Sequence, residues 1–393
     1  MATHPSGKLA KPALAWYREH QRDLPWRRTR DLYAIWISEI MLQQTQVATV
    51  IPYYDRFLTR FPNPTSLASA AEDEVYRLWA GLGYYRRARQ LHAAAKKIVD
   101  EHAGLFPQQL EHVLALPGIG RYTAHAILSF GLDARLGIVE ANTQRLYARL
   151  LHWQGPVDSS EAQKTIWQYA GEIVPAKNCG EFNQAMMEIG SQICTPRNPK
   201  CDACPLSAFC PTGQRGDTDA IPAPKPKKSY TDLTEAVVLI RNTSAQWLVR
   251  RCGKSERWAG LWDFPRFDVT RCKGRSEVVK SITQAIFEQF RIHVDLVDTK
   301  HSLRHAVTRY RIQLLSFLGE LRADCIHAPA QENSVECSLW LDESELQDLA
   351  WNASAKRILK WLQESHLQGA KNHPQARRAP SSAKAPRNPG RRN

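Results

Sequence analysis

Residues 116–123, with the sequence LPGIGRYT, decide the fold of the first half of this chain. They join two apolar, helix-forming stretches, and Gly118 and Gly120 predict a tight turn between them. The backbone N–H groups of such a turn point outward at a helix start, where they bind phosphate without recognising sequence. A Gly-x-Gly turn alone is weak evidence, because many helix connections use one. Next to Arg121 and in a basic chain, this turn favours contact with a DNA backbone.

The composition agrees with a nucleic-acid partner. The 393 residues carry 53 Lys and Arg against 39 Asp and Glu, a net charge of +14 that favours polyanions. The hydrophobic share of 43% excludes a wholly disordered chain. No stretch approaches the ~20 consecutive apolar residues of a membrane helix. The first residues lack the apolar centre of a secretion signal, so we expect an intracellular protein without membrane contact.

Helical periodicity extends in both directions from the turn, so we expect residues 14–210 to be almost entirely helical. The second half alternates strand-like and helix-like segments, which indicates an α+β domain. We expect strands at 235–240, 246–250 and 310–318, and helices at 278–290 and 355–362. The predicted organisation is a helical domain over 1–212, a linker over 213–230, an α+β domain over 231–365 and a basic, disordered tail over 366–393.

Four of the nine cysteines crowd into 17 residues, Cys194, Cys201, Cys204 and Cys210, separated by six, two and five residues. Zinc sites usually pair two Cys-x-x-Cys units some distance apart, whereas only one such pair exists here. The compact, unequal spacing favours a [4Fe–4S] cluster, with zinc as the alternative. The alternative role is purely structural: the cluster only holds a loop together, which is compatible with any function.

Two further stretches carry polar or aromatic side chains suited to DNA. Glu39, Gln43 and Gln46 fall at i, i+4 and i+7 and predict a polar stripe on a helix, either a base-contacting face or an ordinary solvated one. Residues 79–89, WAGLGYYRRAR, place aromatic residues before three arginines. That order suits a wedge entering a base stack beside phosphate contacts, or a buried aromatic pair at a helix start.

Together these motifs resemble the MutY-type adenine DNA glycosylases of the endonuclease III superfamily. The resemblance lies in residues 24–27 (LPWR), 41–47 (MLQQTQV), 81–85 (GLGYY), 182–187 (FNQAMM), the Gly-x-Gly turn and the four cysteines. It continues more loosely to about residue 365, where 258–265 (WAGLWDFP) is similar to the entry of the family's Nudix-like domain. The implied fold is an all-α helix–hairpin–helix glycosylase domain with an iron–sulfur loop, followed by an α+β Nudix-like domain.

The resemblance implies a base-excision enzyme that flips out adenine mispaired with 8-oxoguanine or guanine and hydrolyses its N-glycosidic bond. By resemblance Glu39 is the acid that protonates adenine, because a carboxyl group in a partly dry pocket keeps its proton at neutral pH. Glu140, with Asn142, corresponds to the second catalytic carboxylate, which stabilises positive charge on the sugar. Tyr122 stands where strand-cutting relatives carry the lysine of a Schiff base, which implies a monofunctional glycosylase.

Three departures from the family pattern matter. Glu140 replaces the family's Asp and adds a methylene, so either the pocket has adjusted or activity is reduced. The family's His-x-Phe-Ser-His motif for 8-oxoguanine becomes residues 305–309 (HAVTR), which keeps a hydroxyl at Thr308 but has Arg309 in place of His. The helix that holds magnesium in Nudix hydrolases has a single Glu in residues 284–289, so we predict no nucleotide pyrophosphatase activity.

The remaining expectations concern binding. The resemblance implies contacts with double-stranded DNA or the A:8-oxoguanine or A:G mispair at Arg27, Arg30, Gln43, Gln44, Thr45, Leu82, Tyr84, Gly118, Gly120, Thr308 and Arg309. Tyr84 is the expected wedge, the hairpin is expected to hold a monovalent cation, and the protein is expected to be a monomer. The alternatives are a mismatch glycosylase for thymine or uracil and a non-catalytic lesion-binding protein.

Overall fold

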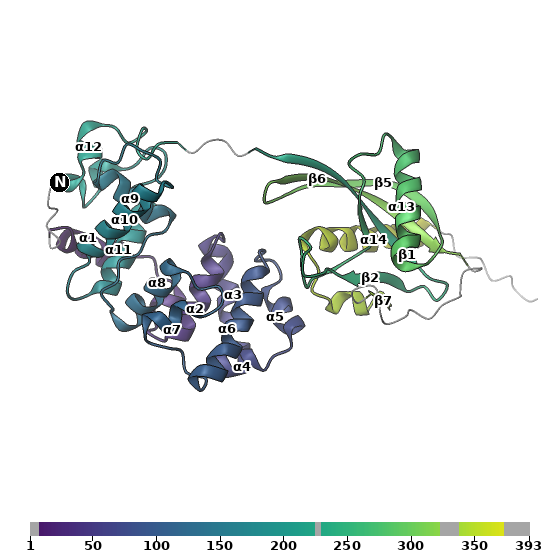
Figure 1. Cartoon of the computed structure of the whole chain (residues 1–393), viewed down its shortest axis with the longest axis horizontal. Coiled ribbons are helices and arrows are strands. Elements are labelled where there is room, and N and C mark those ends of the chain that lie inside the picture. The colour runs from purple at the N-terminus through teal and green to yellow at the C-terminus, as the bar shows by residue number, and fades with distance from the viewer. Residues whose placement is uncertain (1–7, 225–228, 323–337, 373–393) are drawn as a thin grey trace, which may run out of the picture.

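A computed structural model describes residues 8–224, 229–322 and 338–372 of the chain, as two domains joined by a linker (Figure 1). The first domain is all helical and the second is built on a β-sheet, which confirms the predicted fold class. In the described part of the chain, no helix is long and apolar enough to cross a membrane.

The helical domain has two apolar cores. One gathers around α2, α3, α5 and α6, and the other around α1, α9, α10 and α11. The helices are α1 (Ala10–His20), α2 (Leu32–Leu42), α3 (Val47–Arg60), α4 (Pro64–Ala68), α5 (Glu72–Trp79), α6 (Arg86–His102), α7 (Leu110–Leu114), α8 (Arg121–Leu132), α9 (Ala141–Leu150), α10 (Ser160–Ile173), α11 (Cys179–Gln192) and α12 (Pro211–Arg215). A cavity lies between the two cores.

The predicted polar stripe on one helix is wrong. Helix α2 ends at Leu42 and α3 begins at Val47, so only Glu39 of the stripe lies in a helix. Gln44 has a φ of 57°, a left-handed conformation that cannot continue a right-handed helix. Gln43 and Gln46 therefore lie on a connecting segment, and they do not share a face with Glu39.

The second domain is a mixed sheet with one helix on each face. Its sheet has the order β3-β2-β1-β6-β5, with β1 parallel to β6 and β5 antiparallel to β6, while β4 pairs with β1 and β7 with β2. Its elements are β1 (Thr231–Arg241), β2 (Trp247–Arg251), β3 (Trp262–Asp263), β4 (Arg266–Asp268), α13 (Arg275–Phe290), β5 (Val294–Val307), β6 (Tyr310–Leu321), β7 (Ser338–Leu341) and α14 (Ala353–Asn372). Alternate residues of β1 pack under α14 and under α13, which gives the sheet two buried faces.

Helix α14 continues to Asn372, so the backbone of residues 366–372 is helical where a disordered tail was expected. The remainder of that tail, residues 373–393, lies outside the described residues.

The two domains touch each other directly. Arg251 of β2 pairs with Glu72 at 3.1 Å and with Asp73 at 2.8 Å, both at the start of α5. Leu261 packs into the core around that helix.

Candidate active site and metal centre

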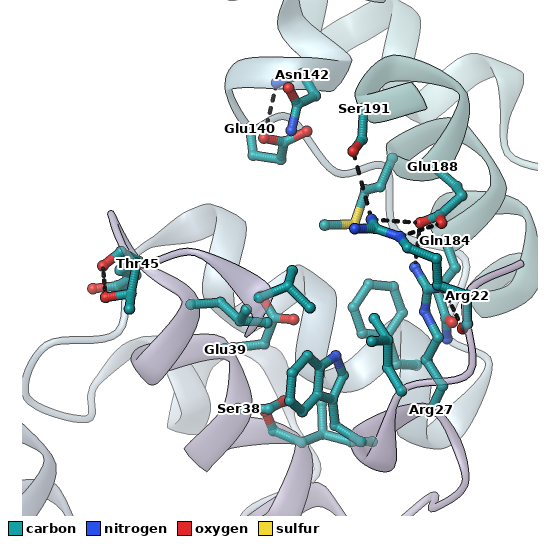
Figure 2. Close-up of a pocket in the computed structure, with 18 of the residues that line it drawn as sticks. Arg22, Arg27, Ser38, Glu39, Thr45, Glu140, Asn142, Gln184, Glu188 and Ser191 are labelled. Atoms are coloured by element: carbon teal, nitrogen blue, oxygen red, sulfur yellow. Dashed lines mark hydrogen bonds and ion pairs between the residues drawn. The ribbon is translucent and has the colours of Figure 1, made fainter. Parts of the chain in front are cut away.

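A cavity of about 520 Å³ opens between the two cores of the helical domain, a size typical of small-ligand sites. Its walls come from the segment after α1, from α2 and the segment after it, from α8, from the N-terminal end of α9 and from the second half of α11. Figure 2 shows the carboxyl groups of Glu39 and Glu140 projecting into it from different elements. The cavity thus brings together side chains about 100 residues apart in sequence (140 − 39 = 101).

Glu39 is a buried acid, only 4% exposed, in the last turn of α2. Burial raises its pKa to about 7, the nearby Glu140 carboxyl adds to the increase, and a 2.7 Å hydrogen bond from the Tyr122 hydroxyl opposes it. Tyr122 is in the first turn of α8, directly after the Gly-x-Gly hairpin. At neutral pH a substantial fraction of Glu39 therefore carries a proton that it can donate.

Glu140 caps the N-terminus of α9. Its two carboxylate oxygens accept 2.8 Å hydrogen bonds from the backbone N–H groups of Asn142 and Thr143. Burial raises the pKa of Glu140, and these two hydrogen bonds oppose the increase. The Glu140 side chain is thus folded back onto the first turn of its own helix. Asn142 lines the cavity beside it and accepts a 3.1 Å hydrogen bond from Arg145.

A buried ion cluster forms the wall opposite Glu39, and sequence reasoning missed most of it. Arg22 contacts Glu188 at 2.6 Å and Arg27 contacts it at 2.7 Å, while Glu188 itself is fully buried. Burial alone would raise the pKa of Glu188, but the hydrogen bonds from both arginines outweigh it and hold the pKa at about 2. Only Arg27 was expected here. The available signal was Glu188 within the apolar stretch AMMEIG of α11, since an acid that is buried must be paired.

The segment after α2 contributes Gln43, Gln44 and Thr45 to the cavity wall. Gln43 donates a 3.4 Å hydrogen bond to Thr123 of α8. Leu82 and Tyr84 lie outside this wall, on the loop between α5 and α6. Tyr84 is 54% exposed, so its ring is accessible to a binding partner, whereas Leu82 is buried, with 5% of its surface exposed.

The hairpin glycines differ in what requires them. Gly118 has a φ of 79°, and a Cβ there would lie 2.7 Å from the Gln90 side chain, so only glycine fits. A Cβ at Gly120 would meet nothing within 4 Å, so packing does not require glycine there. Within the described part of the chain, neither backbone N–H makes a hydrogen bond. Both are exposed donors at the start of α8.

Three further expected contact residues also lie away from the cavity. Arg30 is exposed and does not line it. Thr308 and Arg309 form the turn between β5 and β6, a hairpin that points toward the helical domain in Figure 1. Thr308 has a φ of 51°, a strained conformation for a β-branched residue, and the Arg309 guanidinium lies 5.1 Å from the Tyr310 ring centroid.

The four cysteines line a second cavity, of about 390 Å³. The fully buried guanidinium of Arg149 donates a hydrogen bond to the Cys194 sulfur at 3.2 Å, and the Gly213 N–H donates one to the Cys210 sulfur at 3.4 Å. No three His, Cys, Asp or Glu side chains of the described residues approach closely enough to hold one metal ion.

Three regions of the chain match known protein families. Residues 37–172 match the family model of HhH-GPD superfamily base excision DNA repair proteins. Residues 194–210 match the iron-sulfur binding domain of endonuclease III, and residues 236–361 match the NUDIX domain. A solved thermostable thymine-DNA glycosylase superposes on 54% of this chain and 97% of its own, with a TM-score of 0.50 and 28% identity.

The chain belongs to the adenine DNA glycosylase family, the DNA N-glycosylases that act on double-stranded DNA in base excision repair. The adenine DNA glycosylase of Buchnera aphidicola subsp. Schizaphis graminum is 35% identical over 349 residues, which cover 88% of this chain and 96% of that protein. The adenine DNA glycosylase of Homo sapiens is 40% identical over 265 residues, 64% of this chain and 48% of that protein.

Proposed function

We propose that this enzyme removes adenine opposite 8-oxoguanine, and also opposite guanine, by hydrolysis of the N-glycosidic bond. The observation that carries the proposal is the buried Glu39, with its pKa raised to about 7, facing a cavity large enough for an extruded base. A base inside the helical stack is out of reach of such a buried acid, so the adenine must leave the stack first.

The chemistry depends on the two carboxyl groups. Glu39 gives its proton to a ring nitrogen of adenine, and the bond to the sugar breaks with its electron pair moving to the base. Glu140, whose carboxylate is fixed by two N–H groups, stabilises the positive charge that develops on the sugar. The deprotonated Glu39 then takes a proton from the water that adds to the sugar, which leaves an abasic site.

Recognition of the mispair is shared between the domains in this proposal. Tyr84 enters the stack, Gln43 and Gln44 contact the bases, and the hydroxyl of Thr308 bonds 8-oxoguanine. Arg27 lines the base cavity. The remaining contacts with the two DNA strands, direct or through neighbouring residues, come from Thr45, Leu82, Arg30 and Arg309. The N–H groups of Gly118 and Gly120 bind a phosphate, and the hairpin carbonyls hold a monovalent cation.

After base release the DNA strand stays intact in this proposal. Tyr122 has no amine for a Schiff base with the sugar, so the enzyme has no covalent route to strand cleavage at this position. We propose that it acts as a monomer in the compartment that holds the genome, associated with the nucleoid.

The four cysteines would hold a [4Fe–4S] cluster in this proposal, which their compact, unequal spacing in the sequence and the match of residues 194–210 to an iron-sulfur binding domain support over a single zinc ion. Such a cluster would add charge and cross-link the chain between Cys194 and Cys210. Arg149 would offset the negative charge of the thiolates, since it is the buried cation nearest Cys194.

The test is single-turnover adenine release from duplexes that contain A:8-oxoguanine, A:G or A:T. We expect release in that order, with A:T at background, and strand scission only after alkali is added. Release from A:T as fast as from A:8-oxoguanine, or scission without alkali, would contradict the proposal.

A further inference from the structure

The mechanism has not used the arginine run after the predicted wedge, and one of its side chains is buried. Arg87, the second residue of α6, is only 8% exposed, although its neighbour Arg86 is exposed. In the described part of the chain, no acidic side chain is paired with it. Burial of an unpaired cation is costly, so its surroundings must supply compensating acceptors.

Those acceptors come from two different segments. The Nη1 group donates to the carbonyl oxygens of Ile40 at 2.8 Å, Met41 at 2.9 Å and Gln43 at 2.5 Å. The Nη2 group donates to the carbonyl oxygens of Leu82 and Gly83, each at 3.1 Å. Nη2 also donates to the hydroxyl of Thr45 at 3.1 Å.

The first set of acceptors lies at the C-terminal end of α2, where helix carbonyls lack intrahelical partners. A cation there is favoured by the helix dipole. The guanidinium also lies against two rings, 5.2 Å from the centroid of Trp79 and 5.6 Å from that of Tyr84. One planar cation is thus in contact with the end of the acid-bearing helix, the glutamine segment and the wedge loop.

Both segments have backbones that need such support. Gln44 and Tyr84 have φ values of 57° and 49°, a left-handed region that is unfavourable for these residues and persists only where neighbours fix it. Lysine has three donors on one atom and cannot span the two segments, whereas the arginine fork can.

We propose that Arg87 is a positioning residue that locks residues 43–45 and the 81–84 loop into one rigid unit, so that the glutamines and Tyr84 enter the duplex together. The inference rests on the proposed function, because it assigns those two segments to base extrusion. Its consequence is that Arg87 controls extrusion of the adenine, and it leaves proton donation by Glu39 unchanged.

The test compares Arg87→Lys and Arg87→Met with Arg77→Met, a matched change at an exposed arginine of α5. We expect single-turnover adenine release to fall about 10- to 100-fold in both Arg87 variants, as for a displaced positioning group. The pH at which the rate falls should equal that of the wild type. In a Glu39→Gln background, 2-aminopurine at the target position should unstack less with Arg87→Lys than with Arg87 intact.

Two results would overturn the proposal. One is a wild-type rate at temperatures well below the melting point of the variant, which would make the role of Arg87 merely structural. The other is a slower rate with unchanged 2-aminopurine unstacking or a shifted pH profile, which would place its effect on the chemical step. If Arg87→Met does not fold, Arg87→Lys decides. Failure of the proposed function is a separate outcome, since it would appear in the wild-type substrate preference.

Discussion

At the scale of single residues, function and stability oppose each other at Glu39. The pKa of this acid is about 7 in the folded protein against an ordinary value of 4.5. The folded state therefore binds the proton more tightly than the unfolded chain does. Stability is highest below pH 4.5 as far as this group is concerned, and it is lost as the pH rises through 7.

Glu39→Gln removes this titration and keeps an acceptor for the Tyr122 hydroxyl. We expect the variant to be more stable than the wild type at pH 8, by up to roughly 3 kcal/mol, and about equally stable near pH 4.5. Thermal or urea unfolding at both pH values measures the difference. A variant less stable than the wild type at pH 8 would show that the ionised acid is well solvated in the folded protein.

Glu140 is the residue at which this chain departs from the pattern it resembles. Its carboxylate accepts hydrogen bonds from two backbone N–H groups of α9, and we expect the pocket to have adjusted to the longer side chain. We expect Glu140→Asp to fold normally, because Asp is a good N-cap, yet to lose about 10- to 100-fold in single-turnover release. A rate equal to or above that of the wild type would mean that the pocket still suits the shorter side chain.

The local parts of the site were predictable from sequence, because turns, caps and metal ligands depend on nearby residues. Glu39 and Tyr122 line one cavity, and the four cysteines line a second one. Glu188 could not be placed, since it meets Arg22 and Arg27 only after α11 packs against the N-terminal segment, more than 160 residues away. The break after α2 was also missed, because the side chain that binds its free carbonyl groups, Arg87, lies in another helix.

At the scale of elements, the hairpin before α8 separates folding from binding. Gly118 is required by its backbone and by Gln90, whereas Gly120 faces open space. The strand β5 shows the opposite limit of sequence reasoning. This strand was not predicted, because its many polar residues leave no run of apolar residues. Its pairing with β6 fixes it as a strand.

Replacement of the two glycines by alanine should therefore give different results. Gly120→Ala is expected to fold like the wild type but to bind duplex DNA more weakly, because its methyl group would lie between the exposed N–H groups and a phosphate. Gly118→Ala should lower the melting temperature. Calorimetry measures the melting temperature of each variant, and titration with duplex DNA at fixed salt measures its affinity. Normal DNA affinity in Gly120→Ala would show that the phosphate lies elsewhere.

At the scale of the whole molecule, the sheet domain contacts the element that leads into the wedge loop. Arg251 pairs with the first turn of α5, whose last residue, Trp79, contacts Arg87. This arrangement connects the sheet domain to the element that leads into the proposed wedge. Two partly exposed ion pairs contribute about 1 kcal/mol or less each, so the effect on base preference should be modest.

Arg251→Ser should reduce the ratio of release from A:8-oxoguanine to release from A:G by about fivefold, corresponding to about 1 kcal/mol. The matched control is Arg311→Ser, which removes an exposed ion pair with Asp232 inside the sheet domain. Single-turnover rates on both duplexes measure the ratio. An unchanged ratio in Arg251→Ser would mean that the domains recognise the mispair independently of this contact.

The pH dependence of single-turnover adenine release from A:8-oxoguanine tests the central assignment most directly. If Glu39 is the acid, the rate should fall as the pH rises through about 7, and Glu39→Gln should release no adenine at any pH although it binds the duplex. A rate that is independent of pH between 6 and 9, or a Glu39→Gln variant with wild-type release, would contradict the account.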